Sequence, residues 1–143
     1  MNWKPSKREK HIDIQMDQAT LKIVSGDDRL ESLQAYNIEL SADIFYQRIL
    51  DSDHYVESYR SPITGSLCIS ASNDDKKQLQ EVLMNMSEGK TFVFMDPNSD
   101  RIDTFEDVYV TECSYIGDLK YYIVKVVGHR YYMSSKEGAG YVY

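Results

Sequence analysis

The clearest pattern in the chain is an alternation of apolar and polar residues that begins at Tyr36. Every second position is apolar or aromatic: Tyr36, Ile38, Leu40, Ala42, Ile44 and Tyr46. A period of two predicts a β-strand with one buried side and one solvent-facing side. The segment 51–53 then favours a turn, and residues 54–59 can return antiparallel to the first strand. We therefore predict a long hairpin over about 36–59.

One segment has helical spacing instead. Its apolar residues recur at intervals of three and four positions: Leu79, Val82, Leu83 and Met86. This spacing places them on one face of a helix. Ser72, Asn73 and Asp74 are candidate N-caps, and Gly89 is a stop signal. We predict one amphipathic helix over about 74–88 that packs on a sheet.

Shorter apolar or alternating runs predict the other strands, within residues 12–24, 66–71, 91–95, 108–116 and 121–132. About seven strands and one helix favour a mainly β (α+β) fold, either a β-sandwich or a small barrel, in a single domain. We expect this domain to span 12–132. A flexible basic arm over 1–11 is expected before it, and a flexible tail over 133–143 after it.

Composition narrows the classes of protein further. The length of 143 residues fits one domain, and an apolar content of 42% is too high for a disordered chain. No apolar run approaches the roughly 20 residues of a membrane-spanning helix, and the first residues lack the apolar core of a secretory signal. A net charge of −7 argues against nucleic-acid binding by the whole surface.

The charge is unevenly placed along the chain. Residues 1–11 have a net charge of +3, so the rest of the chain carries −10. This arm is either a solvated terminus, a phosphate-binding segment, or a segment that docks on the acidic body of a neighbouring copy. Trp3 favours docking, because an exposed tryptophan is costly unless it fills a pocket. The candidate inter-subunit residues are Trp3, Lys4, Lys7, Arg8 and Lys10.

One acidic segment has the spacing of a calcium loop. Oxygen-bearing side chains stand at the ligand positions of an EF-hand count, at Asp96, Asn98, Asp100, Thr104 and Asp107. However, Arg101 occupies the position that needs glycine, and the last position is Asp107 where the longer glutamate normally reaches the ion. The alternative is an acidic surface loop that runs to about Phe105.

The sequence contains no motif of a known catalytic class. Cys68 and Cys113 lie in predicted strands, where a small buried thiol is the ordinary interpretation. A Cys–His nucleophile remains an alternative, because such pairs meet only in the fold. The histidines lack metal-ligand spacing with either cysteine. We therefore predict no enzyme, with no catalytic residue, metal or cofactor.

Tyrosine is unusually frequent, with 12 residues in the chain. Adjacent pairs occur at Tyr121-Tyr122 and Tyr131-Tyr132, and neighbours in a strand point to opposite faces. One member of each pair is therefore expected in the core. The outward members are either ordinary strand surface or part of a protein-binding surface. The second interpretation predicts a monomeric or dimeric adaptor or inhibitor.

The order of these elements resembles that of phage tail-tube proteins and of related tube and baseplate subunits of contractile injection machines. The resemblance rests on the hairpin Tyr36–Tyr59, on Gly65–Ser70 leading into the helix, and on the strands within Phe92–Phe94, Val108–Tyr115 and Tyr121–His129. In that family, hairpins of six small β-sandwich subunits join in a barrel around a lumen. The resemblance covers most of residues 12–132 and is one of pattern.

The resemblance implies a structural virion protein of the tail, assembled in the host cytoplasm. Its partners would be further copies in hexameric rings and other tail proteins, with no membrane and with DNA that passes without specific binding. Five acids of the hairpin would face the lumen and repel the phosphates of DNA: Glu39, Asp43, Asp51, Asp53 and Glu57. A connector, terminator or baseplate component of the same machine is the alternative within this class.

Overall fold

A computed structural model of the chain describes residues 7–50, 53–71, 76–135 and 140–142. The predicted mainly β single domain is confirmed, and the described residues form nine strands and one helix. The strands are β1 (Lys7–Ser25), β2 (Asp28–Arg48), β3 (Tyr55–Arg60), β4 (Ile63–Ser70), β5 (Lys90–Met95), β6 (Arg101–Ile116), β7 (Tyr121–Gly128), β8 (Arg130–Ser135) and β9 (Gly140–Val142). The helix α1 is Lys76–Met84.

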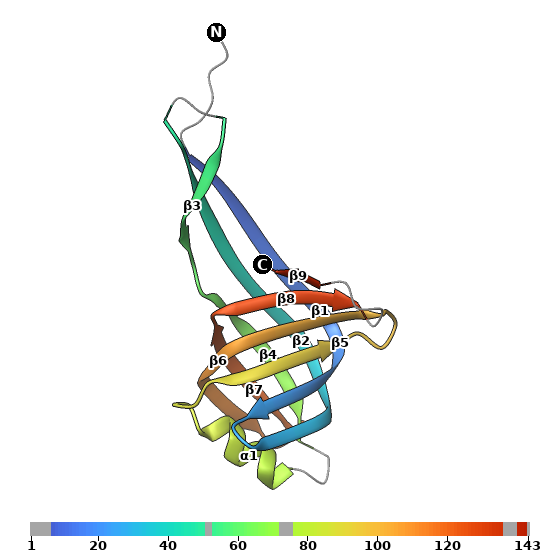
Figure 1. Cartoon of the computed structure of the whole chain (residues 1–143). Helices are drawn as coiled ribbons and strands as arrows, with labels where there is room; N and C mark the ends of the chain where they lie inside the picture. Colours follow the sequence, from blue (N-terminus) through green and yellow to red (C-terminus); the bar gives the residue numbers. More distant parts are fainter. Residues whose placement is uncertain (1–6, 51–52, 72–75, 136–139, 143) are drawn as a thin grey trace.

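Six strands close into a ring, so the fold is the small barrel (Figure 1). All pairings are antiparallel in the order β5-β1-β2-β4-β7-β6, and β6 returns to β5. The barrel interior is filled by apolar side chains, among them Phe92, Phe94 and Phe105. These residues line an internal cavity of only about 10 Å³. The interior is therefore a packed core.

The helix α1 lies at one end of the barrel (Figure 1). Leu79, Val82 and Leu83 are buried, which confirms three of the four predicted stripe positions. The described helix ends at Met84, earlier than predicted, and Met86 lies beyond it with 40% of its surface exposed. Lys90, at the start of β5, is only 1% exposed and donates hydrogen bonds to the carbonyl oxygens of Asn85 (2.5 Å) and Glu88 (2.8 Å). Burial lowers the pKa of the Lys90 amine.

The longest hairpin is formed by β1 and β2. They pair from Lys7–Gln47 to Ser25–Asp28, and Gly26 in the turn between them has a φ of 59°. The end of β2 also pairs with β3, as expected for the hairpin predicted over 36–59. This pairing is shorter than predicted, because only residues 44–48 and 55–60 take part. β2 therefore has β1 on one side and, along its length, β4 and then β3 on the other.

Asn37 interrupts the alternation in β2. Its φ of 51° lies in the left-handed region, which asparagine tolerates better than most residues. The buried positions therefore change from Leu33 and Ala35 to Ile38 and Leu40. Tyr36 is displaced to the outer side, where it is 38% exposed, so its predicted place on the buried side is wrong.

Both predicted flexible ends require correction. Residues 7–11 belong to β1 and pair with 43–47 of β2, so Lys7, Arg8 and Lys10 lie in a strand. Trp3 and Lys4 lie outside the described residues. At the other end, β8 extends to Ser135 and pairs with β9. Backbone pairing with β2 and with β6 extends the domain beyond the predicted limits.

Gly65 in β4 permits a close approach between β4 and β2. A Cβ atom at this position would lie 1.8 Å from the backbone oxygen of Glu39, a contact that only a backbone shift could relieve. We expect Gly65→Ala to lower the free energy of unfolding by about 1–2 kcal/mol, as overpacking does, although alanine usually stabilises a strand relative to glycine. Chemical denaturation measures this change.

Gly117→Ala is the matched control, because its added Cβ would have no neighbour closer than 4.0 Å. It should change the free energy of unfolding by less than about 0.5 kcal/mol. Equal effects of the two substitutions would contradict the close approach at Gly65.

Candidate functional site

The most distinctive feature of the structure is a three-stranded extension of the barrel (Figure 1). It consists of residues 7–12 of β1, 42–48 of β2 and 55–60 of β3, and we call it the ribbon. It projects from the end of the barrel opposite α1 (Figure 1). The ribbon forms because β1 and β2 are much longer than β4 and β5, which pair with them only near the barrel.

Both edges of the ribbon lack a neighbouring strand among the described residues. β5 pairs with β1 only over Thr20–Val24, so residues 7–19 pair with β2 alone. β3 likewise pairs with β2 and with no other described strand. An unpaired edge presents backbone N–H and C=O groups that can pair with a strand of another chain.

The ribbon and the β2–β3 connection at its tip also expose apolar side chains, of which sequence reasoning missed Ile49 and Leu50. Leu50, in the connection between β2 and β3, is 85% exposed, and Ile49 is 45% exposed. Phe45 and Tyr59 lie on paired strands with ring centroids 5.8 Å apart, and both are exposed. Large exposed apolar groups of this kind mark interaction surfaces when they cluster. The signal was present at Ile49-Leu50, an apolar pair inside a polar turn region.

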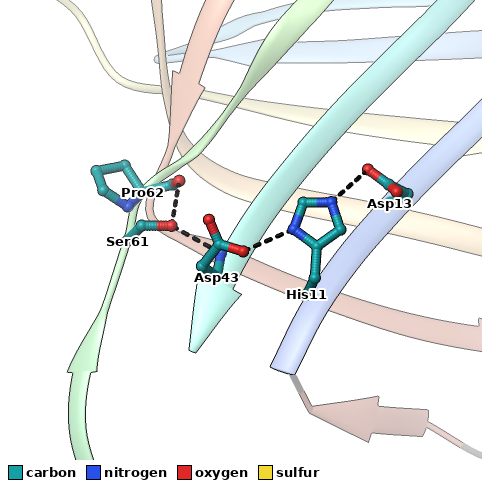
Figure 2. Close-up of polar contacts among 5 residues, drawn as sticks. All are labelled: His11, Asp13, Asp43, Ser61 and Pro62. Atoms are coloured by element: carbon teal, nitrogen blue, oxygen red, sulfur yellow. Dashed lines mark hydrogen bonds and ion pairs between the residues drawn. The ribbon is translucent and has the colours of Figure 1, made fainter. Parts of the chain in front are cut away.

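His11 connects the ribbon strands where they meet the barrel (Figure 2). Its Nδ1 lies 2.6 Å from Oδ1 of Asp43, and its Nε2 lies 2.9 Å from Oδ1 of Asp13. These hydrogen bonds raise the pKa of the His11 imidazole. The backbone N–H of Asp43 donates to Oγ of Ser61 (2.8 Å). In return, the backbone N–H of Ser61 donates to the backbone carbonyl oxygen of Asp43 (2.9 Å).

This cluster holds strands together. Ser61 Oγ contacts Asp43 and the oxygen of Pro62 (3.2 Å), and the imidazole of His11 bonds to carboxylates (Figure 2). It therefore lacks the hydroxyl-to-imidazole contact of a serine nucleophile and its base. Residue spacing could not identify the cluster, because His11 and Asp43 meet only through the β1–β2 register.

The five predicted lumen-facing acids do not share one face. Glu39 and Asp43 project from the outer side of β2, on the same side as Asp13. Glu57 pairs in register with Tyr46 and therefore lies on the opposite side, where it forms an ion pair with Arg60 (2.7 Å). The physical reason is the alternation of side chains together with the register shift in β3. Asp53 is exposed in the connecting loop, and Asp51 lies outside the described residues.

The candidate calcium loop is shorter than predicted. β6 begins at Arg101, so only residues 96–100 form the connection. Oδ1 of Asp96 accepts a hydrogen bond from the backbone N–H of Asn98 (2.9 Å), which is a turn stabilised by its own side chain. Asp100 lies in the same turn, whereas Asp107 lies within β6. Among the described residues, no group of three or more His, Cys, Asp or Glu side chains is placed to hold a metal ion.

The cysteines and tyrosines occupy mainly packing positions. Cys68 and Cys113 are half-buried free thiols, and burial raises the pKa of both. A raised pKa leaves little of the reactive thiolate at neutral pH. The expectation that each tyrosine pair places one member in the core is confirmed, because Tyr122 and Tyr131 are 2% and 7% exposed.

Sequence reasoning also missed a buried carboxylate between β6 and β8. Asp103 is 1% exposed and accepts a hydrogen bond of 2.6 Å from the hydroxyl of Tyr131. Nε of Arg101 donates to both carboxylate oxygens, at 3.1 and 3.0 Å. Burial and the hydrogen bond to Asp103 raise the pKa of Tyr131 to about 12. Both oxygens of the Asp103 carboxylate accept hydrogen bonds. The carboxylate adjoins the apolar core, where Tyr131 stacks on Phe105.

Comparison of the chain with models of known protein families, with curated proteins and with solved structures found no match. Among the described residues, no helix is long and apolar enough to cross a membrane.

Proposed function

We propose that this protein is a structural subunit that self-assembles through its ribbon, as a tube or tube-like subunit of a phage tail. In the proposed assembly, six copies form a ring around a channel for DNA, and the rings stack. The observation that carries the proposal is the projecting ribbon with two unpaired edges. The resemblance in element order is the reason for proposing a phage tail protein among the possible self-assembling proteins.

Two further observations support an assembly role. The edges of the ribbon present backbone N–H and C=O groups that no other described strand pairs with, so further strand pairing along them would be favourable. The described residues also contain no converging group of metal ligands, and the barrel interior is filled.

The direct test is the mass of the purified full-length protein in solution. Mass photometry across a concentration series should show species larger than the 16.6 kDa chain, and negative-stain microscopy should show rings or tubes. A monodisperse monomer at all concentrations and salt conditions would refute the proposal.

We expect Leu50→Ser to weaken assembly without weakening the fold. The Leu50 side chain is 85% exposed, so its removal should change the free energy of unfolding by less than about 0.5 kcal/mol. In an assembly that buries the tip, the same substitution should raise the concentration at half-assembly by at least roughly tenfold, because a buried leucine contributes about 1.5–3 kcal/mol. Sedimentation velocity measures the assembly.

Leu119→Ser provides the matched control. Leu119 is 62% exposed, but it lies in the β6–β7 turn, away from the ribbon (Figure 1). Its replacement should leave assembly unchanged. If both variants assemble like the wild type, the tip of the ribbon is not an interface.

A further inference from the structure

The ribbon has one strongly basic side. Residues paired across antiparallel strands share a side, and so do alternate residues of one strand. The register therefore places four cations and two tyrosines together: Arg8, Lys10, Arg48, Arg60, Tyr46 and Tyr55. We call this set the basic face. The Arg8 guanidinium lies 4.2 Å from the centre of the Tyr55 ring. Among the described residues, Glu57 is the one acidic residue that these strand pairings place on the same side.

A surface of opposite charge lies on the other side of the same sheet. Two grooves of about 320 and 380 Å³ meet at Gln15 of β1. Asp13 and Glu39 line the first groove, and Asp17 and Asp96 line the second. No lysine or arginine is among the residues that line either groove. We call these four acids and their two grooves the acidic trough.

The two surfaces face in opposite directions within one molecule. Arg8 and Lys10 have the same parity in β1 as Ile12 and Ile14, which point toward the barrel side, whereas Asp13 and Gln15 alternate with them. One copy therefore cannot bring its own basic face into its own acidic trough. Contact between the two surfaces requires a second copy, and such a head-to-tail contact repeats until it closes into a ring or extends as a filament.

The trough suits a projecting partner. β4 contributes small residues to the first groove, namely Thr64, Gly65 and Ser66. The unpaired edge of β1 runs beside both grooves, since Asp13, Gln15 and Asp17 all precede the first residue that pairs with β5. Glu39 and Asp17 form no ion pair with another described residue, so both carboxylates can pair with cations of a partner.

We propose that the basic face of one copy docks in the acidic trough of the next copy. This inference rests on the proposed self-assembly and specifies the two surfaces that meet. Charge complementarity steers the encounter and fixes the orientation of the partners. A nucleic acid is a poorer occupant of the basic face, because the chain carries a net charge of −7, which repels phosphates.

Charge reversal of either surface tests the proposal. The first variant carries Lys10→Glu and Arg48→Glu, and the second carries Asp17→Lys and Glu39→Lys. Each variant alone should require at least about tenfold more protein for half-assembly than the wild type, since interfacial charge pairs that are broken lose this much or more. An equimolar mixture of the two variants should restore assembly, because reversed charges meet again across one interface.

Matched controls reverse exposed charges elsewhere. Lys77→Glu on α1 and Asp118→Lys in the β6–β7 turn should assemble like the wild type. Circular dichroism and thermal melting confirm that all variants are folded before the comparison. Assembly is measured by mass photometry at low and at high salt, and high salt should weaken the wild-type assembly.

The outcomes separate this inference from the proposed function. If the wild type assembles and both reversal variants do too, or if the mixture fails to restore assembly, the two surfaces do not meet. If Lys10→Glu with Arg48→Glu leaves assembly intact but abolishes retention of double-stranded DNA, the basic face is a nucleic-acid surface and the inference is overturned. A wild type that stays monomeric overturns both this inference and the proposed function.

Discussion

Replacing Asp103 by alanine is expected to lower the free energy of unfolding by about 1–3 kcal/mol, the cost of losing hydrogen bonds to a charged group and of leaving a buried hydroxyl without this acceptor. The Asp103 carboxylate is buried and receives hydrogen bonds from Tyr131 and from Arg101. In Asp103→Ala the Tyr131 hydroxyl, inside a largely buried residue, loses its acceptor. Urea denaturation followed by circular dichroism measures the change.

Two comparisons make the expectation specific. Asp100→Ala removes an exposed acid from the preceding turn and should cost less than about 0.5 kcal/mol. Tyr131→Phe should lower the free energy of unfolding less in the Asp103→Ala background than in the wild type, because the Tyr131 hydroxyl has already lost this partner. A loss below about 1 kcal/mol for Asp103→Ala would show that the carboxylate is not held as the structure indicates.

The parts of the fold that sequence predicted are those set by local patterns. Alternation identified most of β2, and spacing at three and four residues identified α1. These features depend on neighbours in the chain, so they are visible in the sequence. The predicted packing of Tyr122 and Tyr131 follows from the same alternation.

The missed features depend on long-range pairing. The left-handed residue Asn37 changes which side of β2 is buried, and alternation alone therefore misplaces Tyr36. The closure of the barrel through β5 and β6 and the contact between His11 and Asp43 are likewise set by register. The register shift in β3 also separates Glu57 from the acids of β2, which is why a single acidic face was predicted wrongly.

The candidate site illustrates the same limit more sharply. The sequence predicts a flexible basic arm over 1–11, because most chain termini are solvated. In the structure Arg8 and Lys10 are strand residues whose positions are fixed by Tyr46 and Ile44. Their grouping with Arg48 and Arg60 follows from two separate strand pairings, so it could be recognised only once both registers were known.

Alkaline pH is expected to destabilise the protein through Tyr131. The structure raises the pKa of Tyr131 from 10.0 to about 12, chiefly by burial and also through its hydrogen bond to Asp103. Below pH 10 the phenol is neutral in both folded and unfolded chains, so this contribution to stability is fully present. Between pH 10 and 12 the unfolded chain ionises first, and stability falls by about 1.4 kcal/mol for each pH unit, reaching a loss of about 2–3 kcal/mol.

Other groups titrate in the same range, so the informative quantity is the difference between the wild type and Tyr131→Phe. The variant lacks the ionisable hydroxyl, and its free energy of unfolding should decline less steeply from pH 10 to 12 than that of the wild type. Tyr121→Phe is the matched control, because Tyr121 is more exposed and lies on β7, and its pH profile should follow the wild type. Denaturation curves at half-unit pH intervals would show the difference. Parallel profiles for the wild type and Tyr131→Phe would contradict a buried, hydrogen-bonded phenol and, with it, the contact to Asp103.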